Sequence, residues 1–267
     1  MSVLNQLRER VFACWRTHCP LCELTSHAGL LCAGCEEDCY ASRQRRLLCV
    51  RCANDRSDSW GHCSELDPET PRLPLFNASR LSSNWCDNGC DNWCDHCRDQ
   101  PPPQAYACAA LDYGFPAQLL IVDFKLRGQL SLARPLAHLM LKSAQAVIEA
   151  QRPEAWVPVP ASAQRLQQLG FSPPQQLAWH MSRLSGIALR TSWLTRIRDT
   201  APQKSRSRAE RQTALAHSLL ASPSVRGRWV GVVDDVMTTG STFAEASRAL
   251  LAAGARGVTA VAAMRTS

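Results

Sequence analysis

The sequence has 267 residues, of which about 45% are hydrophobic, so it can form one large domain or a domain with a small appendage. No apolar run reaches the roughly 18 residues that a membrane-spanning helix needs, and the N-terminal residues lack the apolar stretch and cleavage site of a signal peptide. These features predict a cytoplasmic protein without a membrane span.

Cysteine content and charge divide the sequence at the same place. Of the 14 cysteines, 13 lie between Cys14 and Cys97. Residues 1–100 carry 11 Lys or Arg and 14 Asp or Glu, a net charge of −3, whereas residues 101–267 carry 19 and 9, a net charge of +10. The basic part indicates an anionic ligand, and charge alone leaves phosphates, nucleic acid and an acidic surface open.

Four C-x-x-C pairs lie in the cysteine-rich part, with a spacing that is typical of zinc sites. The pairs are Cys19 with Cys22, Cys32 with Cys35, Cys49 with Cys52, and Cys94 with Cys97. Each pair places two thiolates on one side of a tight turn, and two such turns complete a tetrahedral shell for Zn²⁺. A redox-active C-x-x-C and a disulfide framework are the alternatives, and the latter is disfavoured because a reducing cytosol does not keep disulfides.

Eight cysteine ligands predict two structural zinc sites. The simplest grouping is sequential, with the first two pairs in one site and the last two pairs in the other. A cross-braced grouping also fits the spacing, and Cys86 with Cys90 is a less regular pair that could compete for the second site. The remaining cysteines are interpreted as free or packed thiols.

Residues 1–100 are interpreted as a zinc-ribbon-like region that metal binding folds, because they offer little else to form a core. Within them, residues 54–93 are rich in Ser, Asp, Asn and Pro and predict a loop insertion. Residues 100–104 contain three consecutive prolines and are typical of a stiff linker. We therefore place a domain boundary at residue 100 and a second domain over residues 101–267.

Strands and helices alternate along the second domain. The hydrophobic patterns predict strands over 105–111, near 156–157, over 229–233 and over 258–263. They predict helices over 117–126, 129–150, 162–168, 174–186 and 242–253. Pro135 predicts a kink in the second of these helices. This alternation indicates an α/β fold with a mostly parallel sheet flanked by helices.

The most informative stretch follows the strand at 229–233. Asp234 and Asp235 come directly after this strand, at the end where parallel sheets bind their ligands. Residues 238–242 then lead into a helix, where backbone N–H groups, hydroxyls and the helix dipole favour a phosphate. Gly240 lets the backbone approach such a ligand closely.

A phosphate beside two carboxylates, which can accept hydrogen bonds from a vicinal diol, is the arrangement that ribose 5-phosphate requires. The alternative interpretation is an acidic strand end followed by an ordinary helix cap. Both features together, after a short apolar strand, are much rarer than either alone. The stretch therefore favours a sugar-phosphate site.

The stretch VVDDVMTTGST, from Val232 to Thr242, resembles the phosphoribosyl pyrophosphate (PRPP) motif of type I phosphoribosyltransferases. The four C-x-x-C pairs, then FKLRG, VPVP, RLQQLGF, SRAER and this motif, in that order, are similar to the ComF family of competence-associated proteins. The resemblance spans nearly the whole sequence. It implies a type I phosphoribosyltransferase-like fold and a PRPP-binding protein that acts in natural competence, in the uptake of transforming DNA.

The resemblance also implies roles for individual residues. Asp234 and Asp235 would hold the ribose hydroxyls, directly or through Mg²⁺, and Arg165 would lie near the pyrophosphate. Lys204 and Arg208 belong to a basic stretch that resembles the mobile loop closing over PRPP, and they would complete the catalytic set with the two aspartates. The remaining PRPP-binding residues would be Met237, Thr238, Thr239, Gly240, Ser241 and Thr242.

Two classes of function remain open. One is a Mg²⁺-dependent phosphoribosyltransferase with an unidentified acceptor, in which a closing basic loop stabilises the departing pyrophosphate. The other is an accessory protein without transferase activity, either a PRPP-binding protein or a zinc-ribbon nucleic-acid binder. Its partners would be single-stranded DNA or DNA-uptake proteins.

Overall fold

The computed structural model describes residues 16–44, 48–56, 93–197 and 218–266. Several residues that the sequence singled out lie outside these ranges: Lys204, Arg208, Cys86 and Cys90. The predicted loop insertion lies outside them as well, apart from its first three residues and its last.

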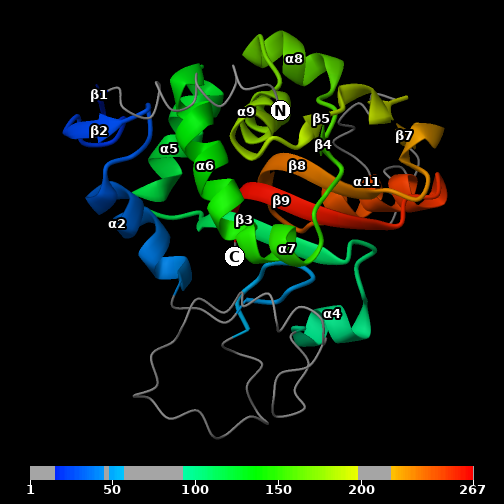
Figure 1. Ribbon diagram of the computed structural model, residues 1–267. Coiled ribbons are helices and arrows are strands. Elements are labelled where there is room, and N and C mark those ends of the chain that lie inside the picture. The colour runs from blue at the N-terminus through cyan, green and yellow to red at the C-terminus, as the bar shows by residue number, and fades with distance from the viewer. Residues whose placement is uncertain (1–15, 45–47, 57–92, 198–217, 267) are drawn as a thin grey trace, which may run out of the picture.

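A five-stranded parallel sheet forms the centre of the molecule (Figure 1). Its strands lie in the order β3 (Tyr106–Asp112), β9 (Gly257–Arg265), β8 (Trp229–Met237), β4 (Ala155–Pro158) and β5 (Ala188–Leu189). Every neighbouring pair of strands is parallel. All residues of β9 are buried, as expected of an inner strand in a parallel sheet that is covered on both faces.

Helices cover both faces of this sheet. The helices α6 (Ala133–Ser143) and α9 (Pro173–Ser185) pack on one face, and α11 (Ser241–Ala252) packs on the other. Side chains alternate along β3, so Cys108 joins the hydrophobic cluster under α6 and α9, whereas Ala107 joins the cluster under α11. The sheet therefore separates two hydrophobic cores.

Further elements border the sheet. The helices α5 (Ala117–Leu126) and α8 (Ala163–Leu169) follow β3 and β4, α7 (Gln145–Ala150) follows α6, and β6 (Leu194–Arg196) pairs antiparallel with β7 (Leu219–Ala221). Short 3₁₀ turns cover Leu130–Leu132, Thr191–Trp193 and Pro223–Val225. Among the described residues, no helix has both the length and the apolar character that crossing a membrane requires.

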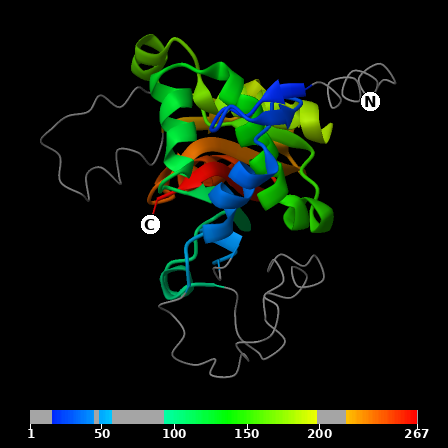
Figure 2. The ribbon, with the colours of Figure 1, turned by 90° about the vertical axis from the view of Figure 1, so that its left-hand side faces the viewer.

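The cysteine-rich part lies beside the sheet. It consists of the hairpin of β1 (Arg16–His18) and β2 (Thr25–His27), the helix α2 (Ala33–Gln44), the segment 48–56 and the short helix α4 (Asp95–Asp99). Figures 1 and 2 show α2 next to β3 and α6. The Ala107 N–H donates to the Val50 carbonyl (2.8 Å) and joins the segment 48–56 to β3. A domain boundary at residue 100 stays a prediction.

The helix predicted over 129–150 differs from the structure. It is a 3₁₀ turn followed by α6 and α7, which are separate helices because the backbone at Ala144 leaves helical geometry (φ −95°, ψ 1°). Pro135 does not kink α6, since it lies in the first helical turn, where its missing N–H has no intrahelical acceptor to lose. The predicted single helix and its kink are therefore wrong, whereas α5 has the predicted bounds.

The strand β8 is longer than predicted. The apolar pattern placed its end at Val233, but pairing with β9 continues to Met237, with Asp234 opposite Ala262. Asp234 and Asp235 accordingly lie inside the carboxyl end of the strand rather than after it. The two carboxylates end the apolar run but not the backbone pairing. The sequence pattern shows only where the apolar run ends, so it could not show that the strand continues.

Candidate functional site

The two acidic residues of β8 point to opposite faces of the sheet, because side chains alternate along a strand. Asp235 alternates with Val233, which packs in the cluster under α6 and α9, and only 6% of Asp235 is exposed. Asp234 alternates with Val232 of the α11 side and is partly buried. The pair therefore places one carboxylate on each side of a central strand, near its carboxyl end.

Lys125, at the end of α5, forms an ion pair with Asp235. Its Nζ lies 2.8 Å from Asp235 Oδ2, and the two side chains are only 15% and 8% exposed. A charge-assisted hydrogen bond is strong in such a poorly hydrated position. Lys125 belongs to the FKLRG stretch, but the sequence indicates no role for it, because no neighbouring residue reveals its partner.

Backbone N–H groups hold both carboxylates in place. The Asp235 N–H donates to Asp234 Oδ1 (2.8 Å), and the Val236 N–H donates to Asp235 Oδ1 (2.7 Å). Burial raises the pKa of Asp234 well above its usual range, and the negative charge of Asp235 raises it further. A ligand that donates hydrogen bonds or carries positive charge would relieve this cost of ionising both acids.

Asp234→Asn is expected to stabilise the folded protein at neutral pH. The pKa of Asp234 is higher in the folded than in the unfolded chain. The folded state therefore binds more protons in the window between the two pKa values, and wild-type stability falls as the pH rises through it. The variant lacks this loss, so its melting temperature should exceed that of the wild type by a few degrees at pH 7.

Thermal melts between pH 4 and pH 8 measure this difference. The melting temperatures of the variant and the wild type should converge as the pH falls toward the ordinary pKa of an aspartate, about 3.9. Glu154→Gln is the matched control, because Glu154 is an exposed carboxylate, paired with Arg228 at the opposite end of the sheet. An Asp234→Asn protein that melts at or below the wild-type temperature at pH 7 would contradict the expectation.

The loop after β8 leads into α11 through Gly240. This glycine has a φ of 77°, in the left-handed region that glycine adopts without strain. It carries no side chain that could cap the helix, and the Ser241 N–H donates to Thr239 Oγ1 (3.3 Å), so the following N–H groups of the first turn suit an anion. Hydroxyl groups line the same loop, where Thr239 Oγ1 donates to Ser241 Oγ (3.0 Å) and both residues are exposed. The neighbouring Thr238 is exposed too, and Thr242 is partly exposed.

Other residues of the predicted PRPP set are placed differently. The side chain of Met237 is buried in the cluster under α11, and its carbonyl accepts hydrogen bonds from two donors at the end of the chain's last strand. Arg165 is exposed on α8, and its N–H donates to Ser162 Oγ (3.2 Å). Lys204 and Arg208 lie outside the described residues. The described structure thus brings together the acidic pair and the loop.

The eight cysteines of the C-x-x-C pairs form two groups. The first group is Cys19, Cys22, Cys32 and Cys35, and the second group is Cys49, Cys52, Cys94 and Cys97. Within each group the Sγ atoms lie within 4.8 Å of one another. This is the sequential arrangement, and the structure does not adopt the cross-braced one.

Each group joins one tight turn to the start of one helix. In both turns the N–H of the first cysteine donates to the carbonyl five residues later, from Cys19 to Leu24 (2.8 Å) and from Cys49 to Asn54 (2.8 Å). The carbonyl of the first cysteine also accepts from the N–H four residues later (2.9 and 2.8 Å). The second pair of each group borders α2 or α4. The two groups are therefore built in the same way.

The sulfur separations fit a metal ion rather than disulfides. Cys22 Sγ lies 3.6 Å from Cys32 Sγ, and Cys52 Sγ lies 3.7 Å from Cys94 Sγ. A tetrahedral shell with Zn–S bonds of about 2.3 Å requires about 3.8 Å, whereas a disulfide requires about 2.05 Å. The Cys94 N–H also donates to Cys49 Sγ (3.2 Å). Both groups could therefore bind a metal ion such as Zn²⁺.

Two further cysteines of the described part are packed thiols. Cys39 of α2 and Cys108 of β3 are buried in the cluster under α6 and α9. Burial raises the pKa of Cys39 to about 11 and that of Cys108 to about 12. Both thiols stay protonated near neutral pH, so they are poor nucleophiles and poor metal ligands.

The protein has a parallel sheet with an acidic pair at the carboxyl end of a central strand, followed by a glycine-containing loop into a helix. Together with the two cysteine groups, these features define a phosphoribosyltransferase-like α/β protein with a cysteine-rich N-terminal part. This is the fold class predicted from the sequence. No protein-family model matches the chain. DNA utilization protein YhgH of Salmonella typhimurium is 30% identical over 248 residues, which cover 91% of this chain and 92% of that protein. The chain belongs to the family of this protein and of competence protein F, the ComF family.

Two further relatives match the chain over a shorter length. DNA utilization protein YhgH of Escherichia coli strain K12 is 33% identical over 165 residues, which cover 61% of this chain and 73% of that protein. Competence protein F of Haemophilus influenzae is 30% identical over 161 residues, which cover 58% of this chain and 70% of that protein. The family predicted from the sequence is thereby confirmed.

Two solved structures are similar over about half of the chain. Glutamine phosphoribosylpyrophosphate amidotransferase from B. subtilis, complexed with ADP and GMP, is 22% identical with a TM-score of 0.34 and covers 48% of this chain. An allosteric regulatory enzyme of purine biosynthesis is 24% identical with a TM-score of 0.33 and covers 49% of this chain. The chain spans 25% of each of these two proteins.

Proposed function

We propose that the chain binds PRPP at the carboxyl end of β8 and acts in DNA utilization or natural competence, as the names of its relatives state for those proteins. The observation that carries the PRPP site is the acidic pair of β8 directly before the loop into α11, with Lys125 paired to Asp235. The carboxylates can accept hydrogen bonds from the ribose hydroxyls, and the loop directly after them can donate to the 5-phosphate. The two kinds of groups thus lie next to each other along the chain, as the hydroxyls and the phosphate do in ribose 5-phosphate.

In this proposal the ribose hydroxyls donate to Asp234 and Asp235. The 5-phosphate accepts hydrogen bonds from the N–H groups and hydroxyls of residues 238–242, where the dipole of α11 adds positive potential. Lys125 already neutralises part of the negative charge of the acidic pair. The hydroxyl donors of a diol stabilise the remaining carboxylate oxygens, directly or through Mg²⁺.

A transferase reaction at this site would break the bond between the anomeric carbon and pyrophosphate and form a bond from that carbon to the acceptor. Negative charge builds on the departing pyrophosphate, and we assign its stabilisation to Lys204 and Arg208, with Arg165 nearby. The carboxylate oxygens of β8 are of the type that Mg²⁺ accepts as ligands. When bound with PRPP, Mg²⁺ would neutralise part of the pyrophosphate charge.

We also propose structural Zn²⁺ in both cysteine groups and single-stranded DNA or DNA-uptake proteins as partners. The four-thiolate donor sets and their sulfur separations support zinc. The net charge of +10 over residues 101–267 and the names of the relatives support a DNA partner. A cytoplasmic location is the compartment that this set of proposals implies.

Calorimetric titration with PRPP and Mg²⁺ tests the proposed ligand site. We expect the wild type to bind, and the double variant Asp234→Asn/Asp235→Asn to lose at least about 100-fold in affinity, since each hydrogen bond to a charged group contributes about 1.5–3 kcal/mol. Glu154→Gln removes the same kind of charge at the amino end of β4 and should bind as the wild type does. Absence of binding by the wild type, or wild-type affinity in the double variant, would overturn the site.

Two further measurements separate the open classes of function. Release of pyrophosphate from PRPP in the presence of candidate acceptors supports a transferase. Binding of single-stranded DNA that weakens with salt, and that persists in the variant Asp234→Asn/Asp235→Asn, supports a nucleic-acid-binding accessory protein.

A further inference from the structure

A buried carboxylate on α11 takes no part in the candidate sites described above. Glu245 lies one turn into this helix, and only 7% of the residue is exposed. Its Oε1 accepts hydrogen bonds from the N–H (3.0 Å) and from the Oγ (2.6 Å) of Ser218, which is 1% exposed. Burying a carboxylate is costly unless donors or a cation compensate it. The two hydrogen bonds therefore fix Ser218, directly before β7, against α11.

Ser218 also joins this carboxylate to a guanidinium. Arg196 Nη1 donates to Ser218 Oγ (3.3 Å), and the same hydroxyl donates to Glu245. A hydroxyl can accept and donate at once, and the members of such a chain strengthen one another. Arg196 is the last residue of β6, and the Ile197 N–H donates to the Ser218 carbonyl (2.8 Å), which extends the pairing of β6 with β7. One serine thus links a cation of β6 to an anion of α11.

The same guanidinium contacts the loop after β4. Arg196 Nε donates to the Pro160 carbonyl (3.2 Å). The preceding residue, Val159, donates its N–H to the Val233 carbonyl (2.9 Å), so this loop begins beside the carboxyl end of β8. It covers residues 160–162 and leads into α8, on which Arg165 lies. Arg196 therefore connects the loop after β4 to the β6–β7 pair.

The chain of contacts joins two loops that border the acidic pair of β8. One is the loop of residues 238–242, which leads into the helix that carries Glu245. The other is the loop of residues 160–162, whose first carbonyl Arg196 holds. In the proposed function the first loop binds the 5-phosphate of PRPP, and the second lies at the pyrophosphate end of the ligand, before Arg165. The separation between the two loops must then match the two ends of PRPP.

We propose that Glu245 and Ser218 are positioning residues, which act through Arg196 to hold the loop after β4 in a fixed place relative to α11. This role rests on the proposed PRPP site and adds a specificity determinant to it. A loop that is held before the ligand arrives does not have to be ordered during binding. The network therefore favours PRPP, which has phosphoryl groups at both ends, over ribose 5-phosphate, which has one.

Hydrogen exchange tests the network without any ligand. The N–H groups of Arg165 and Leu166 donate to Ser162, at the end of the loop after β4, so their protection reports the order of this loop. We expect these two amides to exchange about 10-fold faster in Ser218→Ala, which breaks the link to Arg196 but keeps both charges. Glu245→Ala should have the same effect. Glu245→Gln should restore most of the protection, because its amide oxygen can still accept from Ser218.

Two controls accompany the exchange experiment. Ser222→Ala removes a similar hydrogen bond at the other end of β7, where Ser222 Oγ accepts from the Ser224 N–H (3.3 Å), and should leave both reporter amides unchanged. Amides of residues 258–262, in the buried strand β9, report whether each variant is folded.

Calorimetric titration with PRPP and with ribose 5-phosphate tests the specificity. Ser218→Ala should bind PRPP about 10-fold more weakly than the wild type, an effect of the size of one lost hydrogen bond. It should bind ribose 5-phosphate as the wild type does, whereas a purely structural defect would not separate the two ligands. Arg190→Met removes an exposed charge next to the 3₁₀ turn before β6 and should leave the affinities for both ligands unchanged.

Either of two results overturns the proposal: unchanged exchange of the reporter amides in Ser218→Ala, or equal losses of affinity for PRPP and ribose 5-phosphate. Failure of the proposed function gives a different result, in which the wild type binds neither ligand. That result removes the specificity role, and the exchange experiment still decides whether the network holds the loop. Should Ser218→Ala fail to fold, Arg196→Met, at a partly exposed position, gives the same two readouts.

Discussion

Removal of metal from both cysteine groups is expected to unfold the cysteine-rich part of the protein. In the second group, the buried cluster consists of Cys49, Cys94 and Cys97, with Cys52 and Trp93 packed against it. The metal ligands are thus themselves the local core, and their thiolates repel one another without a cation. The binding free energy of structural Zn²⁺ in small peptides is about 10–16 kcal/mol, far more than such a cluster provides alone.

Limited digestion with trypsin measures this unfolding. After chelation at neutral pH, we expect cleavage after Arg51 and Arg98, which lie next to cysteines of the second group, to become at least about 100-fold faster. The sheet has its own two cores, so the fragment that starts at Asp99, after the cut at Arg98, should persist. Chelator saturated with Zn²⁺ beforehand is the control, and elemental analysis should find two zinc ions per chain. Equal cleavage rates before and after chelation would contradict a structural metal.

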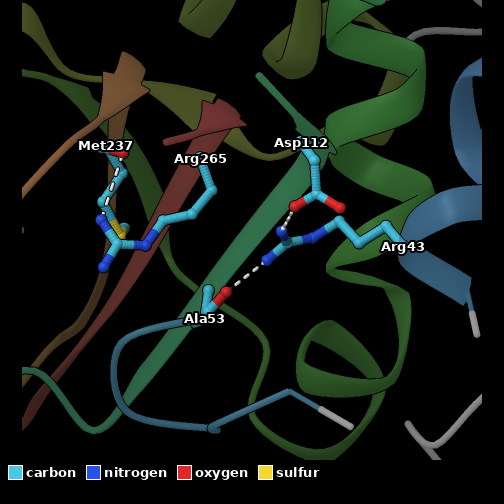
Figure 3. Close-up of polar contacts among 5 residues, drawn as sticks. All are labelled: Arg43, Ala53, Asp112, Met237 and Arg265. Atoms are coloured by element: carbon cyan, nitrogen blue, oxygen red, sulfur yellow. Dashed lines mark hydrogen bonds and ion pairs between the residues drawn. The ribbon is translucent and has the colours of Figure 1, made fainter. Parts of the chain in front are cut away.

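Arg43→Met is expected to destabilise the protein by about 3–5 kcal/mol, the usual cost of breaking a buried ion pair by removing one partner. Arg43, from α2, is only 4% exposed, pairs with Asp112 at the end of β3 and donates to the Ala53 carbonyl (Figure 3). One side chain thereby ties the helix of the first cysteine group to the turn of the second group and to the sheet. The variant removes the guanidinium that pairs with the Asp112 carboxylate.

Denaturant unfolding of a small set of variants checks this value. The double variant Arg43→Met/Asp112→Leu removes both charges and should lose clearly less stability than Arg43→Met alone. Arg228→Met breaks the pair with Glu154 (2.8 Å), in which both side chains are about half exposed, and should cost less than about 1 kcal/mol. A loss below 1 kcal/mol for Arg43→Met would show that the buried pair is not a major contact between the two parts.

Features carried by neighbouring residues were predictable from the sequence. The helix α5 has its predicted bounds because its start is marked by Pro116 and its apolar residues recur at helical spacing, all within a few neighbouring turns. The cysteine pairs could be recognised from the sequence, since a single tight turn brings together two thiolates that are three residues apart. The short strands of the cysteine-rich part, β1 and β2, were missed, because three residues carry no periodicity and form only through pairing with each other.

The order of amino acids specifies which chemical groups the protein can present: thiolates in pairs, two adjacent carboxylates, and a hydroxyl-rich loop with a glycine before a helix. The partners of these groups depend on the three-dimensional fold. It selected Lys125 for Asp235, the sequential grouping of the cysteines, Arg43 for Asp112, and Arg265 for the Met237 carbonyl. Such partners are distant along the chain, and the entropy of closing a loop depends only weakly on its length. Packing of the whole fold, rather than any local pattern, therefore chooses among them.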